Sequence, residues 1–278
     1  MSKIDLASPV VKWVGGKRQL LERLMPLFPE TYTSYCEPFI GGGAVLFALQ
    51  PQKATINDIN SELIGVYRAI KDDVEALIKR LAQFENTKEC FYEVRGWDRN
   101  AELYNQLTDI DKAARVIFLN KTCYNGLYRV NSAGEFNTPF GRYKNPNIVN
   151  ESTLRAVHEY FNTADVTILN TSYSEAVQGL PENSFVYLDP PYDPISVTAS
   201  FTGYNAGGFS RQDQIALRDC CRQLDANGIK FMLSNSATEF IQDIYSDFNI
   251  TIVPAKRAIN SVGSKRGCVD EVVVRNYE

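Results

Sequence analysis

The chain has 278 residues, of which 44% are hydrophobic and 22% charged, and its net charge is -4. A chain of this composition can bury one substantial core and a smaller lobe, which excludes a disordered protein, and without a ~20-residue apolar run or a signal-peptide pattern we expect it in the cytoplasm, with no membrane partner. Six cysteines without a CxxC pair, and the single histidine His158, argue against a metal site and against a histidine-dependent triad.

The first motif is Val11-Lys12-Trp13-Val14-Gly15-Gly16-Lys17, followed from 18 to 28 by apolar residues at helical spacing. This pattern predicts an amphipathic helix that is entered through a glycine turn. Glycines there permit positive φ and let a ligand approach the backbone near the helix start. The motif is not a Walker A loop, because Arg18 follows Lys17 where that loop needs Ser or Thr. A turn that only caps the helix is the alternative.

A second glycine loop occurs in Glu37-Pro38-Phe39-Ile40-Gly41-Gly42-Gly43-Ala44, between a predicted short strand and a helix that runs to Leu49. The next strand, from 54 to 58, ends in Asp58. In a βαβ nucleotide-binding unit, such a loop approaches the nucleotide and such an acid accepts hydrogen bonds from the ribose. We therefore predict that Asp58 is a ribose acceptor. The alternative is an N-cap for the helix that begins near Asn60.

Helical periodicity continues from 61 to 105 and returns from 111 to 121. The segment from 122 to 144 interleaves aromatic and basic residues between turns, which predicts a β-ribbon outside the main sheet. A ribbon fits the DNA major groove, where Arg reads guanine, Asn reads adenine and an aromatic ring can wedge between bases. A structural hairpin with inward-facing aromatics is the alternative.

Basic residues concentrate in two segments of this acidic chain. Residues 112–150 contain six Lys or Arg and one acid, and residues 256–267 contain four and no acid. Two such segments favour a localised surface for a polyanion. Solvated charge on unrelated loops is the alternative for each segment.

The remaining pattern is a helix from 152 to 161 and then strands separated mostly by helices. The strands are expected at 166–169, 185–188, 229–233, 250–253 and 271–274, and the helices at 211–225 and 237–246. With the first two strands, this predicts a twisted, largely parallel α/β sheet of seven strands, whose last strand can be antiparallel. Residues 62–150 are predicted to form a domain inserted between 1–61 and 151–278.

The apolar strand from 184 to 188 is followed by Asp189-Pro190-Pro191-Tyr192. The prolines have no N–H and a fixed φ, so the chain must leave the sheet stiffly at the edge where α/β proteins bind ligands. An acid, a turn with free acceptor carbonyls and an aromatic ring are thereby placed together. A proline-rich turn without a function is the alternative.

Five features together resemble the Dam-type DNA adenine N6-methyltransferases of the α group. They are KWVGGK at 12–17, EPFIGGGA at 37–44, the strand ending in Asp58, YNGLYRVNSAGEFNTPFGRYK at 124–144 and DPPY at 189–192. The resemblance covers nearly the whole chain. It implies a Rossmann-like, seven-stranded methyltransferase sheet with an inserted helical and β-hairpin DNA-recognition domain. It also implies methyl transfer from S-adenosylmethionine, with S-adenosylhomocysteine as product and no metal, to N6 of a flipped-out adenine in GATC.

The resemblance further implies double-stranded DNA as partner, a nucleoid-associated monomer in action, and roles for individual residues. A cognate restriction endonuclease encoded nearby is left open. Catalytic roles carry over to Asp189, Pro190, Pro191 and Tyr192. Cofactor binding carries over to Trp13, Lys17, Glu37, Phe39, Gly41, Gly43, Asp58 and Asp189. DNA contacts carry over to Lys12, Tyr124, Asn125, Leu127, Arg129, Asn137, Pro139, Arg142 and Lys144, with Tyr124 as the intercalating ring.

The chemistry gives DPPY a specific role. Adenine N6 is a poor nucleophile because its lone pair is delocalised into the ring. We expect the Asp189 carboxylate and the Pro190 carbonyl to accept the two N6 hydrogens and to stabilise the positive charge that develops, while Tyr192 stacks on the base. The alternatives are a methyltransferase of an RNA base or of protein glutamine, which typically begins this motif with Asn, and a non-catalytic DNA-binding protein on the same scaffold.

Overall fold

The structure is a computed structural model that describes residues 4, 6–194, 208–256 and 268–278. Two compact units are present. Unit 1 comprises Met1–Arg18 and Ile40–Thr171, and unit 2 comprises Gln19–Phe39 and Ser172–Glu278. The basic side chains predicted at 256–267, Lys265 and Arg266 among them, lie outside the described residues. The predicted boundaries of an inserted domain at 62 and 150 remain a prediction.

The strands that the structure describes form a seven-stranded sheet of order β3-β2-β1-β4-β5-β7-β6. Their bounds are β1 (Tyr35–Glu37), β2 (Lys53–Asn57), β3 (Asp165–Leu169), β4 (Phe185–Leu188), β5 (Lys230–Ser236), β6 (Asn249–Lys256) and β7 (Cys268–Arg275). The pairs β2–β3, β1–β4 and β4–β5 are parallel, and β7 is antiparallel to both β5 and β6. This confirms the predicted α/β sheet with an antiparallel final strand.

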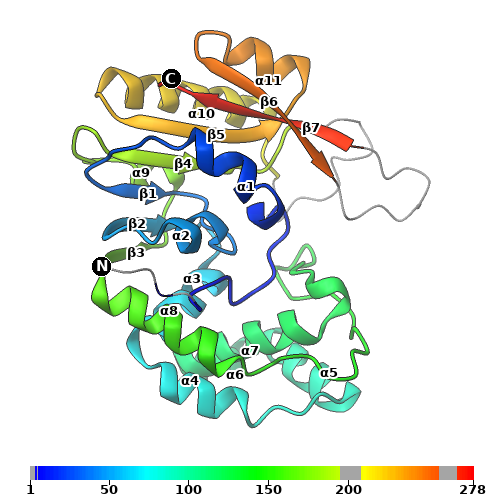
Figure 1. Cartoon of the computed structure of the whole chain (residues 1–278). Coiled ribbons are helices and arrows are strands. Elements are labelled where there is room, and N and C mark those ends of the chain that lie inside the picture. The colour runs from blue at the N-terminus through cyan, green and yellow to red at the C-terminus, as the bar shows by residue number, and fades with distance from the viewer. Residues whose placement is uncertain (1–3, 5, 195–207, 257–267) are drawn as a thin grey trace. The chain divides into compact units, whose positions relative to one another are not determined.

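Helices make up most of unit 1. They are α2 (Ala44–Leu49), α3 (Ser61–Asp72), α4 (Val74–Leu81), α5 (Lys88–Gly96), η3 (Trp97–Arg99), α6 (Ala101–Gln106), α7 (Asp109–Thr122), η4 (Tyr124–Gly126) and α8 (Glu151–Thr163). Polar N-caps such as Asn60 and Thr108 accept backbone N–H groups that would otherwise lack partners. Helix α7 packs against α3, α4 and α5 (Figure 1). It is buried on nearly all sides, and its buried residues include Arg115 and Asn120. The helical prediction for this region is confirmed.

The prediction of one continuous helix from 18 to 28 was wrong. The segment instead contains η1 (Lys17–Gln19), α1 (Leu21–Leu24) and η2 (Met25–Leu27). Pro26 lies at the start of η2, and its missing N–H cannot bond to the carbonyl of the preceding turn. The chain therefore tightens into a 3₁₀ turn and ends at Phe28, which has an extended backbone.

The core of unit 2 lies between strands and helices α10 (Arg211–Ala226), α11 (Glu239–Ile244) and α9 (Tyr173–Ala176). Strand β4 is buried at every position, as a central parallel strand requires. Helix α10 lies beside β5 (Figure 1). Leu217, Cys221 and Leu224 of α10 belong to one buried core cluster with Val186 and Leu233 of the sheet. The buried strand β4 thus presents the residue that follows it, Asp189, at its carboxyl end.

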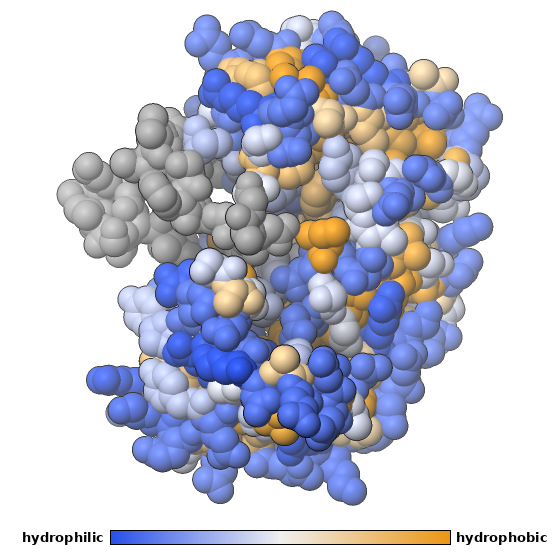
Figure 2. Space-filling model, turned by 180° about the vertical axis from the view of Figure 1, so that it is seen from behind, coloured by the Kyte–Doolittle hydropathy of each residue, from blue (hydrophilic) through white to orange (hydrophobic). Residues whose placement is uncertain are grey.

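Hydrophilic residues cover most of the face shown in Figure 2, with apolar residues in smaller areas between them. No helix within the described ranges is long and apolar enough to cross a membrane. Within those same ranges, no three His, Cys, Asp or Glu side chains are grouped so that they could hold a metal ion.

Candidate active site

The glycine loop of unit 1 is held at its first glycine. The N–H of Gly41 donates to Asp58 Oδ2 at 3.1 Å, and the hydroxyl of Tyr67 donates to the Gly41 carbonyl at 2.7 Å. Gly41 has φ +48°, and a Cβ there would lie 3.0 Å from Cδ1 of Trp13. Gly43 has φ +73°, and a Cβ there would lie 2.8 Å from a ring carbon of Phe47. Only glycine fits either position, so the loop keeps an open backbone surface.

Asp58 follows β2 directly and binds the loop through its carboxylate. Its Oδ1 accepts the N–H of Asn60 at 2.9 Å. Burial raises the pKa of Asp58, while the N–H groups of Asn60 and Gly41 oppose that rise by stabilising the carboxylate. The N-cap of α3 is Asn60, whose side chain accepts the N–H of Leu63. The alternative interpretation of Asp58 as that cap is therefore wrong, and its ribose role stays a prediction.

The two other predicted cofactor residues of unit 1 precede this loop in sequence. Trp13 stacks on Tyr128 with 4.9 Å between ring centroids and adjoins Gly41. Lys17 is buried, 4% exposed, and its Nζ donates to the Gly15 carbonyl at 2.7 Å. The glycine turn thus places a buried ammonium at the start of η1.

The DPPY loop in unit 2 leaves β4 and is held by hydrogen bonds with two side-chain amides. Nε2 of Gln214 donates to the Pro191 carbonyl at 2.8 Å, and the N–H of Asp193 donates to Asn235 Oδ1 at 3.0 Å. No residue of the described part donates to the carbonyl of Pro190, whose ring is buried. Of the two proline carbonyls, that of Pro191 therefore accepts a hydrogen bond within the protein.

Tyr192 is fixed at the far end of its ring. Its hydroxyl donates to Glu271 Oε2 on β7 at 2.7 Å. Burial, then the charges of Asp189 and Glu271, raises the pKa of Tyr192 well above its ordinary value. The hydroxyl therefore stays protonated at neutral pH, and the ring is held by its edge.

Negative charge gathers near the carboxyl end of β4. Burial, then the charges of Asp189, Glu37 and Glu271, raises the pKa of Tyr187 well above its ordinary value. Glu37 is 3% exposed, and one of its oxygens accepts the hydroxyl of Tyr35 at 2.7 Å. Three carboxylates acting on one buried ring form an environment that favours a cation.

An aromatic group adjoins the end of β1 in unit 2. Phe39 stacks on Tyr173 with 5.3 Å between centroids, and both rings meet Phe209 edge-on at 6.2 and 6.3 Å. Phe39 and Tyr173 are only partly buried. A partly exposed aromatic group of this kind suits a planar heterocycle.

The segment from 122 to 144 in unit 1 is a hairpin closed by isolated bridges and not by full strands. The antiparallel bridges join Cys123 to Phe140 and Val130 to Phe136. At its base, Tyr124 is 58% exposed and donates its N–H to the Pro139 carbonyl at 2.8 Å. Asn125 has φ +58°, and its N–H donates to the Tyr143 hydroxyl at 3.0 Å. The turn thus presents the Tyr124 ring to solvent, which contradicts an inward-facing aromatic at this position.

Two predicted DNA-reading residues bind each other across the hairpin. Nε of Arg129 donates to Oδ1 of Asn137 at 2.7 Å, and the N–H of Asn137 donates to the Arg129 carbonyl at 2.9 Å. Of the other predicted DNA contacts, Leu127 is partly buried. The remaining ones are exposed: Lys12, Asn125, Pro139, Arg142 and Lys144.

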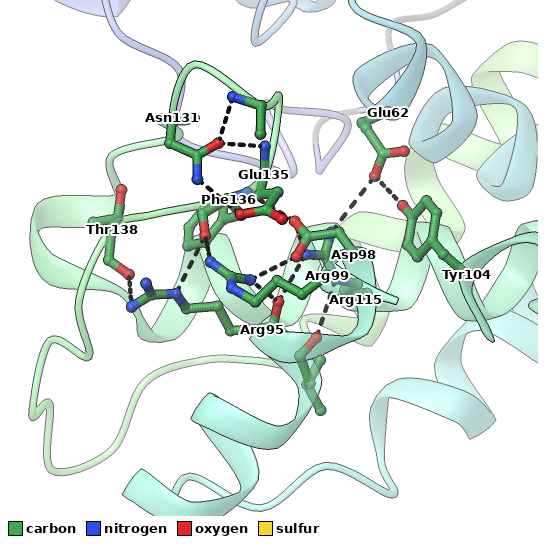
Figure 3. Close-up of polar contacts among 12 residues, drawn as sticks. Glu62, Arg95, Asp98, Arg99, Tyr104, Arg115, Asn131, Glu135, Phe136 and Thr138 are labelled. Atoms are coloured by element: carbon green, nitrogen blue, oxygen red, sulfur yellow. Dashed lines mark hydrogen bonds and ion pairs between the residues drawn. The ribbon is translucent and has the colours of Figure 1, made fainter. Parts of the chain in front are cut away.

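The hairpin is tied to the helices through the backbone of Phe136 (Figure 3). Oδ2 of Asp98 accepts the N–H of Phe136 at 2.7 Å, and Nη2 of Arg99 donates to its carbonyl at 2.6 Å. Arg115 of α7, with its side chain 3% exposed, pairs with Asp98 at 2.5 Å and donates to the Val94 carbonyl at 3.1 Å. A buried ion pair thus helps to anchor the returning side of the hairpin, at Phe136, to the helices of unit 1.

Asn120 of α7 links the N-terminal motif to the hairpin. Its side-chain oxygen accepts the N–H of Lys12, and its Nδ2 donates to the carbonyls of Lys12 at 2.8 Å and Gly126 at 3.1 Å. A Cβ on Gly126 would lie 2.8 Å from the Lys12 side chain. Lys12 is therefore placed beside the base of the hairpin, although the two are far apart in sequence.

Comparison with known proteins decides the family. The model of the D12 class N6 adenine-specific DNA methyltransferases matches residues 13–259. The chain belongs to this family.

Relatives of this D12-class methyltransferase match it almost from end to end. It is 46% identical to the Type II methyltransferase M1.LlaDCHI of Lactococcus lactis over 99% of this chain and 97% of the relative. It is 42% identical to the Type II methyltransferase M.MjaIII of Methanocaldococcus jannaschii, covering 97% and 99%. It is 33% identical to a DNA adenine methylase of Vibrio cholerae, covering 95% and 94%. The Dam-type resemblance and the enzyme class, an adenine-specific DNA methyltransferase, are thereby confirmed over the two alternatives.

The family implies S-adenosylmethionine as cofactor, and the residues of the D12-class enzyme fit that group. Gly41 and Gly43 leave a backbone surface that any side chain would fill. The carboxylates of Glu37, Asp189 and Glu271 suit a positively charged sulfonium. Two structural contributors, Glu271 and the Gln214–Asn235 amide pair, were not foreseen. Glu271 and Asn235 each lie beside other polar residues of their strands, so the sequence does not single them out.

Proposed function

We propose that this D12-class enzyme methylates N6 of an adenine that has flipped out of duplex DNA within GATC. The observation that carries the proposal is the DPPY loop, in which Asp189 and Pro190 directly follow the carboxyl end of β4 and Gln214 binds the Pro191 carbonyl. A stacked adenine cannot present its amino group to such a loop, so the base must leave the helix at a cost of a few kcal/mol.

When bound, S-adenosylmethionine supplies an electrophilic methyl group on a positively charged sulfur. Asp189 and the Pro190 carbonyl accept the two hydrogens of N6 and draw its lone pair out of the ring. The lone pair forms the new nitrogen–carbon bond as the sulfur–carbon bond breaks, and one of the two hydrogens then leaves as a proton. Because the methylated nitrogen is by then a strong acid, Asp189 acts as an acceptor and no strong base is required.

Tyr192 supports the base by stacking. Its hydroxyl donates to Glu271 and stays protonated, so the ring cannot swing freely about its side-chain bonds. The predicted cofactor-binding residues are Trp13, Lys17, Gly41, Gly43 and Asp58 in unit 1 and Glu37, Phe39 and Asp189 in unit 2.

The hairpin supplies sequence recognition in this proposal. The exposed Tyr124 ring enters the base stack and offsets the cost of flipping. Arg129, oriented by Asn137, reads a guanine edge, and Asn125 and Leu127 contact neighbouring bases. Lys12, Pro139, Arg142 and Lys144 complete the DNA contacts. The type II names of two relatives favour a cognate restriction endonuclease as a genetic partner.

One experiment tests the specificity and the flipping together. Labelled methyl transfer is measured on duplexes that contain GATC or differ from it at one base pair, and 2-aminopurine in place of the target adenine reports unstacking by its fluorescence. We expect transfer to GATC only and a rise in fluorescence on binding. Equal transfer to another sequence would refute GATC, and transfer without unstacking would refute flipping.

A further inference from the structure

The DPPY loop has few backbone donors of its own. Pro190 and Pro191 carry no N–H, so the loop cannot be held by ladder hydrogen bonds after β4 ends at Leu188. Gln214 and Asn235 supply contacts instead, one to the carbonyl before Tyr192 and one to the N–H after it. The backbone on both sides of the Tyr192 ring is therefore set by side-chain amides.

The two amides also bind each other. Nδ2 of Asn235 donates to Oε1 of Gln214 at 3.0 Å, and both residues are 0% exposed. Oδ1 of Asn235 accepts a second N–H, that of Ser236, at 2.8 Å. Because a backbone N–H can only donate, the side-chain oxygen of Asn235 must face Ser236 and Asp193. The side-chain nitrogen of Asn235 therefore donates to Gln214, and the nitrogen of Gln214 donates to the Pro191 carbonyl.

The side chain of the neighbouring Asp193 is anchored by residues outside the amide pair. Its side chain is 0% exposed, and its oxygens accept Oγ1 of Thr238 at 2.8 Å and Nε of Arg211 at 3.2 Å. Tyr192 thus lies between a fixed carbonyl, a fixed N–H and, at its hydroxyl, Glu271. A polar network of this kind, in which the two amides and the Asp193 side chain are buried, specifies one geometry where apolar packing would permit several.

We propose that Gln214 and Asn235 are positioning residues for methyl transfer, which orient the Tyr192 ring and reserve the Pro190 carbonyl for the adenine amino group. The inference rests on the proposed contacts of Tyr192 and Pro190 with the flipped base. Neither amide touches substrate, and both act through the loop backbone. A small displacement of such a loop moves the acceptor away from in-line geometry and slows the reaction without weakening binding.

The test compares single-turnover methylation rates of the whole enzyme on a GATC duplex. Gln214→Met keeps the length of the side chain but removes both of its hydrogen bonds, and Gln223→Met on the exposed face of the same helix is the matched control. We expect Gln214→Met to slow methyl transfer by about tenfold or more. Dissociation constants for duplex and cofactor should change by less than about twofold, and the control should behave as wild type.

A second background separates positioning from mere support of the fold. In a Tyr192→Ala enzyme there is no ring to orient, so Gln214→Met should cost less there than in the wild-type enzyme, and the cost that remains is that of displacing the Pro190 carbonyl. An equal cost in both backgrounds, or a Gln214→Met protein that has lost duplex and cofactor binding together, would overturn the positioning role. A normal rate for Tyr192→Ala alone would instead refute the proposed contact of Tyr192 with the base.

Discussion

Arg129 and Asn137 face each other across the hairpin, with the guanidinium of Arg129 donating from Nε to the amide oxygen of Asn137. This contact uses Nε of Arg129 and orients the two terminal nitrogens of the guanidinium. Arg129→Ala should cost about 1–3 kcal/mol of binding to the cognate duplex and relax discrimination at one base pair. Binding to a panel of single-base-pair variants measures both effects. Uniform weakening across the panel would instead mark Arg129 as a phosphate contact.

Asp189 should be indispensable for methyl transfer but not for duplex binding. Asp189→Ala removes a charged acceptor aimed at the developing positive charge, and the loss of one preorganised contact of this kind costs about 10²–10³-fold in rate. Labelled methyl transfer measures the rate, and a gel-shift titration measures binding. Asp219→Ala, at an exposed acid on α10, is the control. A near-normal rate for Asp189→Ala would refute the acceptor role.

The buried ion pair that contacts the hairpin should contribute to the stability of unit 1. Arg115→Ala removes this partner of the Asp98 carboxylate while Arg99 remains paired with it, so the free energy of unfolding should fall by about 1–3 kcal/mol. Urea denaturation measures it. Arg155→Ala, which removes an arginine paired with Glu75 and Glu151 at the surface, should have a small effect. Equal effects of the two substitutions would contradict the structural role of Arg115.

Basic residues at the C-terminal end of the hairpin should govern the salt dependence of DNA binding. Arg142→Ala combined with Lys144→Ala should reduce the slope of log K against log salt by roughly 0.9 for each phosphate that is no longer neutralised. Lys79→Ala, at an exposed lysine on α4, should leave the slope unchanged. An unchanged slope in the double variant would return these two residues to ordinary solvated charge.

The cysteines should differ in reactivity in a way that follows burial. Burial raises the pKa of Cys123 to about 12 and that of Cys220 to about 11. The reactive thiolate is therefore scarce at pH 8 and increases only as the pH approaches these raised values. Among the five cysteines whose side chains the structure describes, partly exposed Cys90 should thus be alkylated first, as peptide mapping after a short iodoacetamide pulse would show. Prior labelling of Cys123 in the native enzyme would contradict its buried position.

The sequence predicted most of the fold because buried strands and amphipathic helices depend on local pattern. The seven strands that the structure describes, and most helices after residue 60, follow from apolar periodicity, whereas the short helices α9 and η4 were not predicted. The helix at 18–28 failed where Pro26 outweighed the periodicity of its neighbours. Local pattern also placed Asp58 and Asp189 at strand ends, because a strand's carboxyl end is visible in sequence.

Side chains that act across long sequence separations could not be predicted in this way. Gln214 looks like any polar residue of an amphipathic helix, and its role depends on a carbonyl 23 positions earlier in the chain. Arg115 and Asp98 look like helix-surface charges, yet they are buried beneath the hairpin. Such contacts depend on which elements pack together, and periodicity carries no information about that.

The contacts of Asn120 impose an order on the folding of the chain. Its amide holds both backbone groups of Lys12, which lies 108 positions earlier in the chain. A hydrogen bond needs both partners, so a nascent chain cannot order Lys12 in this position until α7 has left the ribosome. Lys12 can therefore take up this position only after α7 has formed, and it does so beside the surface proposed to bind DNA.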